Sequence, residues 1–217
     1  MSIIIQDLDS YLLSLLDLPD LIALMKISHY YFDKIQQIKI VNEWKDLNRK
    51  IFSREKIFSM ACKRGYLIYA KWLLDKYKFD IHADNETIFG WACKKGHFDI
   101  SKWLIDLGEN HGYGRINLHA DFGDTFRITC QNGYFEIAKW LVDLGENHGY
   151  GRIDIHGNHE DSFRCCCAKG YIEIVKWLID LGENNGYGRI ALRGLYIERN
   201  HKVISDYLDD LVINHGY

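Results

Sequence analysis

The six cysteines are the residues of this sequence best suited to bind a metal or to attack a substrate. Four of them, Cys62, Cys93, Cys130 and Cys167, recur at intervals of 31, 37 and 37 residues, and the last ends the run 165–167. If they occupy one place in successive helical units, neighbouring sulfurs lie about 8–10 Å apart. Zinc needs its sulfurs about 2.3 Å from one ion, and consecutive helical cysteines diverge by about 100°. We therefore expect the cysteines to be reduced and to pack in a core.

Three histidines share the interval of 37 residues: His82, His119 and His156. The same separation predicts that they form a row along the molecule rather than a metal site. Their expected role is to hydrogen-bond the irregular arms between helices. No Ser-His-Asp or Cys-His pairing emerges from the spacing, so we predict no catalytic residue, no metal, no cofactor and no enzymatic activity.

A glycine-rich loop, Glu-Asn-His-Gly-Tyr-Gly-Arg, occurs at 109–115 and 146–152, and at 183–189 with Asn in place of His. Its amides and arginine are suited to phosphate, but the known phosphate motifs are missing and each Glu offsets its Arg. Two hypotheses stay open: structural loops left by duplication, or a binding surface, because Tyr and Arg are frequent interface anchors. The candidate partner-binding residues are Tyr113, Arg115, Tyr150, Arg152, Tyr187 and Arg189, with Arg127 and Arg164 near the face of the first helices.

An internal repeat must position these side chains, because the stretch 106–116 returns at 143–153 and at 180–190. Each unit has the pattern helix, turn, helix and irregular arm. The sequence predicts five units, at 49–80, 81–117, 118–154, 155–191 and 192–217, the last one trimmed. Since one unit cannot bury its apolar face alone, the units should stack.

Two helices are expected in each unit. The segment 87–97 predicts a short helix ended by Gly96, because glycine enters a left-handed turn without a Cβ penalty. The segment 98–108 has helical apolar spacing and predicts a second helix, with Gly108 as its stop. Stacking should place Trp103, Trp140 and Trp177 in the core.

The first helix carries a family resemblance: Thr87, Ala92, Gly96 and His97 match the ankyrin pattern Thr-Pro-Leu-His-x-Ala-x-x-x-Gly-His, with Ile88 in place of the proline. The resemblance covers about 49–217 and implies an all-α ankyrin-repeat solenoid. Ankyrin proteins bind partners with their arms and first helices, which adds candidates that lie on those elements: Asp84, Asn85, Phe122, Asn158 and His159.

Two departures from the ankyrin pattern are the Asp-Thr-Phe-Arg start at 124–127 and the long loops, which extend the unit beyond the usual length of about 33 residues. Both resemble the divergent ankyrin proteins of giant amoeba-infecting DNA viruses. The resemblance implies a viral source.

Residues 1–48 differ from the repeats and resemble the F-box through 11–21, 27–32 and Trp44, although the family's opening Leu-Pro-x-Glu is missing. This resemblance implies binding to a Skp-type subunit of a ubiquitin ligase. The leucines expected near that adaptor are Leu8, Leu12, Leu16 and Leu18. The alternative is that these helices only cap the first repeat.

The net charge of -3 provides no general attraction for nucleic acid or acidic lipid. No apolar run reaches the roughly 18 residues that span a bilayer, and the first residues lack a secretory signal. We expect a cytoplasmic monomer, in the host cytoplasm if viral, without nucleic-acid or membrane partners. The leading hypothesis is an F-box/ankyrin adaptor that presents an unknown target protein to a host ubiquitin ligase. The rival is a plain ankyrin scaffold.

Overall fold

The computed structural model describes residues 54–120, 124–192 and 201–214, and these are all-α, with helices and no strand. The chain divides into two compact units, residues 1–80 and 81–217. Residues 1–48, with the four leucines predicted to meet an adaptor, lie outside the described ranges, as does Phe122. No helix in the described ranges is long and apolar enough to cross a membrane.

The described part of the first unit is one helix pair, α5 (Arg54–Lys63) and α6 (Leu67–Tyr77). The turn between them closes through Gly65, which has a φ of 81°, and through the Tyr66 amide, which donates to the Ala61 carbonyl at 2.9 Å. Phe58 is fully buried and stacks on Phe79 with ring centroids 4.9 Å apart. The expected helix–turn–helix pattern is therefore present in this unit.

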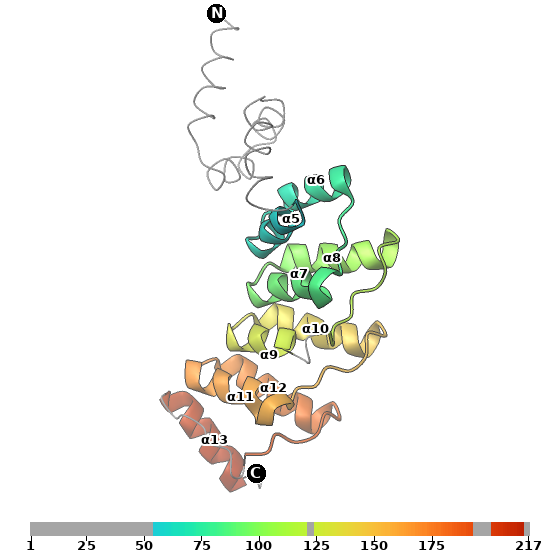
Figure 1. The fold of residues 1–217 in the computed structure, drawn as a ribbon. Helices are drawn as coiled ribbons and strands as arrows, with labels where there is room; N and C mark the ends of the chain where they lie inside the picture. Colours follow the sequence, from blue (N-terminus) through green and yellow to red (C-terminus); the bar gives the residue numbers. More distant parts are fainter. Residues whose placement is uncertain (1–53, 121–123, 193–200, 215–217) are drawn as a thin grey trace, which may run out of the picture. The chain divides into compact units, whose positions relative to one another are not determined.

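The described residues of the second unit form three further helix pairs and one additional helix. The pairs are α7 (Ala83–Lys94) with α8 (Phe98–Asn110), α9 (Asp124–Gln131) with α10 (Phe135–Asn147), and α11 (Gly157–Lys169) with α12 (Ile172–Asn184), followed by α13 (Lys202–Asn214). Figure 1 shows the first helices α7, α9 and α11 in one row and the second helices in another. Neighbouring first helices pack on one another, so the repeats stack as predicted.

The turn inside each pair requires glycine for two reasons. Gly96 has a φ of 79°, which penalises any side chain. A Cβ at this position would also lie 2.5 Å from the ring of Tyr134, which belongs to the next pair. Gly133 meets Tyr171 in the same way, and Gly170 meets His201. The predicted glycine stop of the first helix is confirmed, and the turn is also a contact between repeats.

The predicted stop at Gly108 is wrong, because α8 continues through this residue to Asn110. Gly108 is buried inside the helix, and a Cβ there would lie 2.4 Å from the carbonyl oxygen of Gly114. A Cβ at Gly145 would likewise lie 2.6 Å from the carbonyl oxygen of Gly151, and one at Gly182 would lie 2.6 Å from that of Gly188. These glycines let the backbone of the glycine-rich loop return against the helix that precedes it.

The core of the stack is built on phenylalanine rather than tryptophan. Phe89, Phe126 and Phe163 are at most 2% exposed, whereas Trp103, Trp140 and Trp177 are half-buried. Trp140 and Trp177 each contact the preceding repeat. The ring centroid of Trp140 lies 5.3 Å from that of Phe98, and the ring centroid of Trp177 lies 5.4 Å from that of Phe135. A half-buried seam suits tryptophan, whose ring nitrogen needs a polar neighbour or water.

Candidate interaction surface

Five of the six cysteines are buried, whereas Cys165 is half-buried. Cys62, Cys93, Cys130 and Cys167 have no exposed surface, which confirms their predicted place in the core. Burial raises the pKa of both Cys62 and Cys167 to about 12, so neither thiol forms the nucleophilic thiolate near neutral pH. In the described part of the chain, no group of three or more His, Cys, Asp and Glu residues is arranged to hold a metal ion.

The arms before α7 and α11 enter these helices through a left-handed turn of three residues. Asp84, Asn85 and Glu86 have φ values of 53°, 58° and 61°, and the segment 158–160 repeats them at 54°, 57° and 61°. This conformation costs roughly 1–2 kcal/mol per non-glycine residue, so surrounding contacts must stabilise it. Four residues at these turns are exposed, and all were predicted candidates: Asp84, Asn85, Asn158 and His159.

A His–Glu pair stabilises each of these two turns. The Nδ1 atom of His82 lies 2.8 Å from Glu86 Oε1, and its Nε2 atom lies 2.9 Å from the carbonyl of Tyr113. His156 repeats both contacts with Glu160 and Tyr187. The predicted arm-binding role of the histidines is confirmed. Because both ring nitrogens face acceptors, each ring is best satisfied as a charged imidazolium that donates twice.

The same glutamates fasten the following arm. Glu86 Oε1 accepts the amide of Asn117 at 3.0 Å, and Glu160 Oε1 accepts the amide of Ala191 at 3.3 Å. Position 123, the counterpart of Glu86, is glycine, while His119 still reaches the carbonyl of Tyr150 at 3.1 Å. The four-residue spacing of each His–Glu pair was the signal in the sequence that could have indicated this contact.

These pairs predict a pH-dependent stability. Partial burial opposes the charge of His156, but the hydrogen bonds to Glu160 and to the Tyr187 carbonyl, with the nearby carboxylates, raise its pKa. A raised pKa in the folded state stabilises the fold fully below the unfolded value of about 6.5, and this stabilisation is lost as pH rises through the folded pKa. As pH rises above the ordinary histidine pKa of about 6.5, the free energy of unfolding should therefore fall more steeply for the natural chain than for His156→Gln.

Urea unfolding at several pH values measures this difference, and an NMR titration of the ring locates the pKa directly. Glu160→Gln is the matched control, since it removes the partner charge and should lower the pKa of His156. A ring that titrates at or below its ordinary pKa in the natural chain would contradict the prediction.

The glycine-rich loops clamp one another from repeat to repeat. Arg115 donates to the carbonyls of His148 and Gly149 in the following loop, and its guanidinium lies 4.0 Å from the centre of the Tyr150 ring. The Tyr150 hydroxyl donates back to Glu109 at 2.9 Å. Burial and the Glu109 carboxylate raise the pKa of Tyr150, against the opposing effect of Arg115.

The clamp recurs one loop later with Arg152, which donates to the carbonyls of Asn185 and Gly186 and lies 3.9 Å from the centre of the Tyr187 ring. Arg189 lies 3.2 Å from Glu183 of its own loop. Five loop residues predicted as partner anchors therefore have internal side-chain contacts: Arg115, Tyr150, Arg152, Tyr187 and Arg189. Nothing in the spacing within one repeat indicated that Arg of one loop pairs with Tyr of the next. Tyr113 is half-buried, and its carbonyl accepts from His82.

The face formed by the first helices carries a second ionic network. Arg127 on α9 contacts Asp124 at 2.6 Å and reaches across to Asp161 on α11 at 2.8 Å. Asp161 also accepts the side-chain amide of Gln131 at 2.9 Å, and Arg164 stands 3.6 Å from it. Arg127 thus stabilises the packing of two repeats, while Arg164 is about 40% exposed and remains accessible to a partner.

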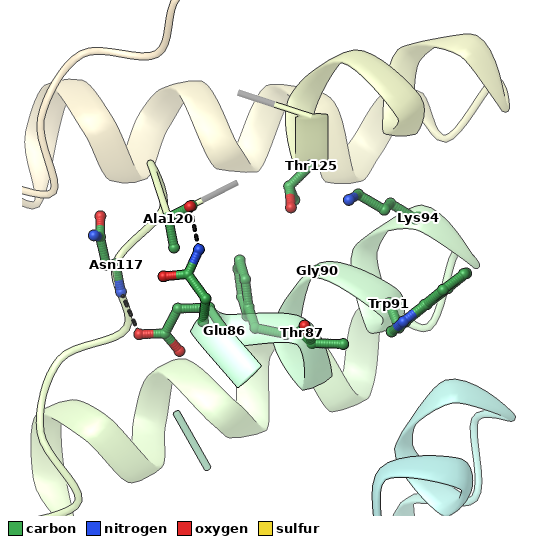
Figure 2. Close-up of a pocket in the computed structure, with 10 residues that line it drawn as sticks. Glu86, Thr87, Gly90, Trp91, Lys94, Asn117, Ala120 and Thr125 are labelled. Atoms are coloured by element: carbon green, nitrogen blue, oxygen red, sulfur yellow. Dashed lines mark hydrogen bonds between the residues drawn. The ribbon is translucent and has the colours of Figure 1, made fainter. Parts of the chain in front are cut away.

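One repeat earlier, a hollow in the surface lies at the positions equivalent to Arg127 and Asp124. Gly90 on α7 stands 37 residues before Arg127, and Thr87 stands 37 residues before Asp124. The hollow measures about 130 Å³, and its lining includes these two residues with Trp91 and Lys94. In Figure 2 the Lys94 side chain extends toward Thr125, across the space above Gly90. The repeat alignment could have predicted this feature, because glycine stands at position 90 where the next two repeats have Arg127 and Arg164.

The hollow combines an apolar floor with a polar rim. Phe89 is 1% exposed and forms part of the floor, whereas Asn85 and Glu86 line the side next to the left-handed turn. Asn85 donates to the carbonyl of Ala120. Glu86 accepts the Asn117 amide, as Figure 2 shows. A concave site with a few convergent polar groups is a good candidate for binding.

Comparison with known proteins yields no counterpart: no family model, no curated protein and no solved structure matches the chain.

Proposed function

We propose that this chain is a non-enzymatic protein-binding module of the ankyrin type, and that the hollow at Gly90 receives a side chain of the partner. The single observation behind the proposal is the hollow on the face of the first helices at Gly90, where the next two repeats have Arg127 and Arg164. Where Arg127 fills the space between α9 and α11, the space beside Gly90 is left open. A cavity of about 150 Å³ admits a benzene-sized group, so this hollow has room for the end of one side chain.

The surroundings of the hollow support binding to a protein. Trp91 and Lys94 are half-buried at its edge, and an aromatic ring beside a cation is typical of interface anchors. The left-handed turn beside it presents Asp84 and Asn85 to solvent. Strained turns with exposed polar side chains persist where the surrounding structure fixes them, as Glu86 does here. A rigid turn loses little entropy when a partner binds.

The ankyrin type itself is proposed on three features together: the sequence pattern at 87–97, stacked helix pairs, and arms that project between them. The longer loops, the fixed His–Glu pairs and the suggested viral source are proposed as properties of a divergent member. The role of residues 1–48 as an F-box-like segment that recruits a Skp-type subunit is a separate proposal, supported by the sequence resemblance alone.

The test is affinity capture with the full chain from an extract of host cells, followed by mass spectrometry. Trp91→Ala and Lys94→Glu should each reduce capture of the specific partner about tenfold, the loss expected when an anchor worth more than about 1 kcal/mol is removed. Lys102→Glu is the matched control, because it makes the same charge change on the exposed face of α8. Circular dichroism verifies that each variant is folded.

Equal capture by the natural chain and by both hollow variants would contradict the proposed binding site. The adaptor role has its own test: a purified Skp-type subunit should bind the full chain and lose binding when Leu12 and Leu16 are replaced by arginine. Failure of the natural chain to bind that subunit would contradict the adaptor role and leave the repeat surface unaffected.

A further inference from the structure

The third glycine-rich loop differs from the first two by a single chemically important residue. Asn185-Gly186 stands where the earlier loops have His111-Gly112 and His148-Gly149. We propose that Asn185 is a site of spontaneous deamidation, which converts it to aspartate or isoaspartate and loosens the third loop. The side chain of Asn185 is exposed and makes no hydrogen bond within the described ranges.

The reaction needs only water. The backbone nitrogen of Gly186 attacks Cγ of Asn185, an N–Cγ bond forms, and the Cγ–Nδ2 bond breaks as ammonia leaves with the amide proton. Water then opens the five-membered succinimide. Attack at Cγ restores the normal backbone with aspartate, whereas attack at the main-chain carbonyl routes the backbone through Cγ as isoaspartate. A following glycine favours the reaction because it has no side chain to hinder the attacking nitrogen.

A second Asn-Gly pair in the chain provides an internal comparison. The side-chain amide of Asn132 donates to the carbonyl of Lys94 at 2.8 Å, and the amide nitrogen of Gly133 donates to Cys130 at 2.9 Å. Both reacting groups of that pair are therefore held. The Gly186 nitrogen donates no hydrogen bond in the described part of the chain, so the pair at 185 and 186 is the more reactive.

Arg152 controls how readily the reaction starts. Asn185 has a ψ of 13°. Its Cα–C bond must therefore rotate before the nitrogen of Gly186 can face Cγ. Arg152 donates to the carbonyl of Asn185 and to that of Gly186 at 3.0 Å. Rotation breaks the first of these hydrogen bonds. The loop clamp therefore slows deamidation while it is closed.

The product disturbs the clamp. In the second loop His148 lies 3.5 Å from Asp143, an attractive contact when the ring is charged. A carboxylate at 185 would instead repel Asp180, the counterpart of Asp143. Isoaspartate also adds a main-chain atom and moves both carbonyls that Arg152 binds. The contact between Arg152 and Tyr187 is therefore weakened after the reaction.

The experiment follows the full-length folded chain during incubation at mildly alkaline pH. Tryptic digestion yields a peptide from Trp177 to Arg189, and mass spectrometry with electron-transfer fragmentation distinguishes Asn, Asp and isoaspartate at position 185. The expected result is conversion at Asn185 several-fold faster than at Asn132, with isoaspartate as the main product. Hydrogen exchange in the third loop should rise in step with conversion.

Three variants separate the roles of the residues. Arg152→Lys should accelerate conversion at Asn185 several-fold, while Arg115→Lys, the same change one loop earlier, should leave that rate unchanged. Asn185→His restores the residue of the other loops and should abolish the mass change in this peptide. Conversion at Asn132 as fast as at Asn185 would overturn the proposed site. An unchanged rate in Arg152→Lys would overturn the controlling role of the clamp.

Discussion

Replacing Phe126 by alanine is expected to lower the free energy of unfolding by about 3–5 kcal/mol. The ring is 2% exposed and lies in the middle repeat of the second unit, with its centroid 6.3 Å from the Trp177 ring of the next repeat. The substitution removes buried apolar surface and leaves a cavity between two stacked helix pairs. Stability in a stack depends on interfaces between neighbouring repeats. The substitution should therefore also reduce cooperativity, so that the repeats on either side of Phe126 unfold in separate transitions.

Urea unfolding followed by circular dichroism and by tryptophan fluorescence measures both effects. The matched control is Ile213→Ala on α13, where the side chain is 77% exposed and the change should be below about 0.5 kcal/mol. A loss at Phe126 as small as that of the control would mean that the phenylalanine row does not carry the core. Transitions that still coincide in the Phe126 variant would contradict the predicted loss of cooperativity.

The periodicity of the sequence was sufficient to predict the helix pairs, because a strict spacing constrains every repeat in the same way. Helical φ and ψ values in α7 resume after Glu86, so the expected start at Thr87 is confirmed. The left-handed turn before it could not be predicted, because Asp84 and Asn85 do not announce three consecutive positive φ values. Only contacts with the arm, through His82 and Glu86, make that conformation stable.

Exposure was harder to predict than helix position. Apolar spacing places a tryptophan on the inner side of the second helix, yet it does not show that the neighbouring repeat covers only part of the ring. Tyr and Arg in the loops looked like surface anchors because both are polar and repeated. Their pairing across loops depends on the distance between successive repeats, and the sequence of a single repeat does not reveal that distance. Arg115 and Tyr150 illustrate this, since they are 35 positions apart in sequence.

Replacing Gly145 by alanine should destabilise the protein by about 1–3 kcal/mol, although alanine is the better helix former by about 1 kcal/mol. Gly145 lies inside α10, and a Cβ would stand 2.6 Å from the carbonyl oxygen of Gly151. The obstacle is backbone rather than a flexible side chain, so the loop must move away from the helix. That displacement carries Arg152 with it and should weaken its contact with Tyr187.

Gly157→Ala is the matched control, because the added Cβ would meet only the Asp154 carboxylate, at 3.6 Å, an ordinary contact. There the reduced freedom of the unfolded chain should leave stability unchanged or raise it by up to about 1 kcal/mol. If the two Gly→Ala substitutions change the free energy of unfolding in opposite directions, the close approach of loop and helix, rather than helix propensity, accounts for glycine at position 145. Two stabilising substitutions would contradict this, because the loop would then have to lie farther from α10 than its glycines allow.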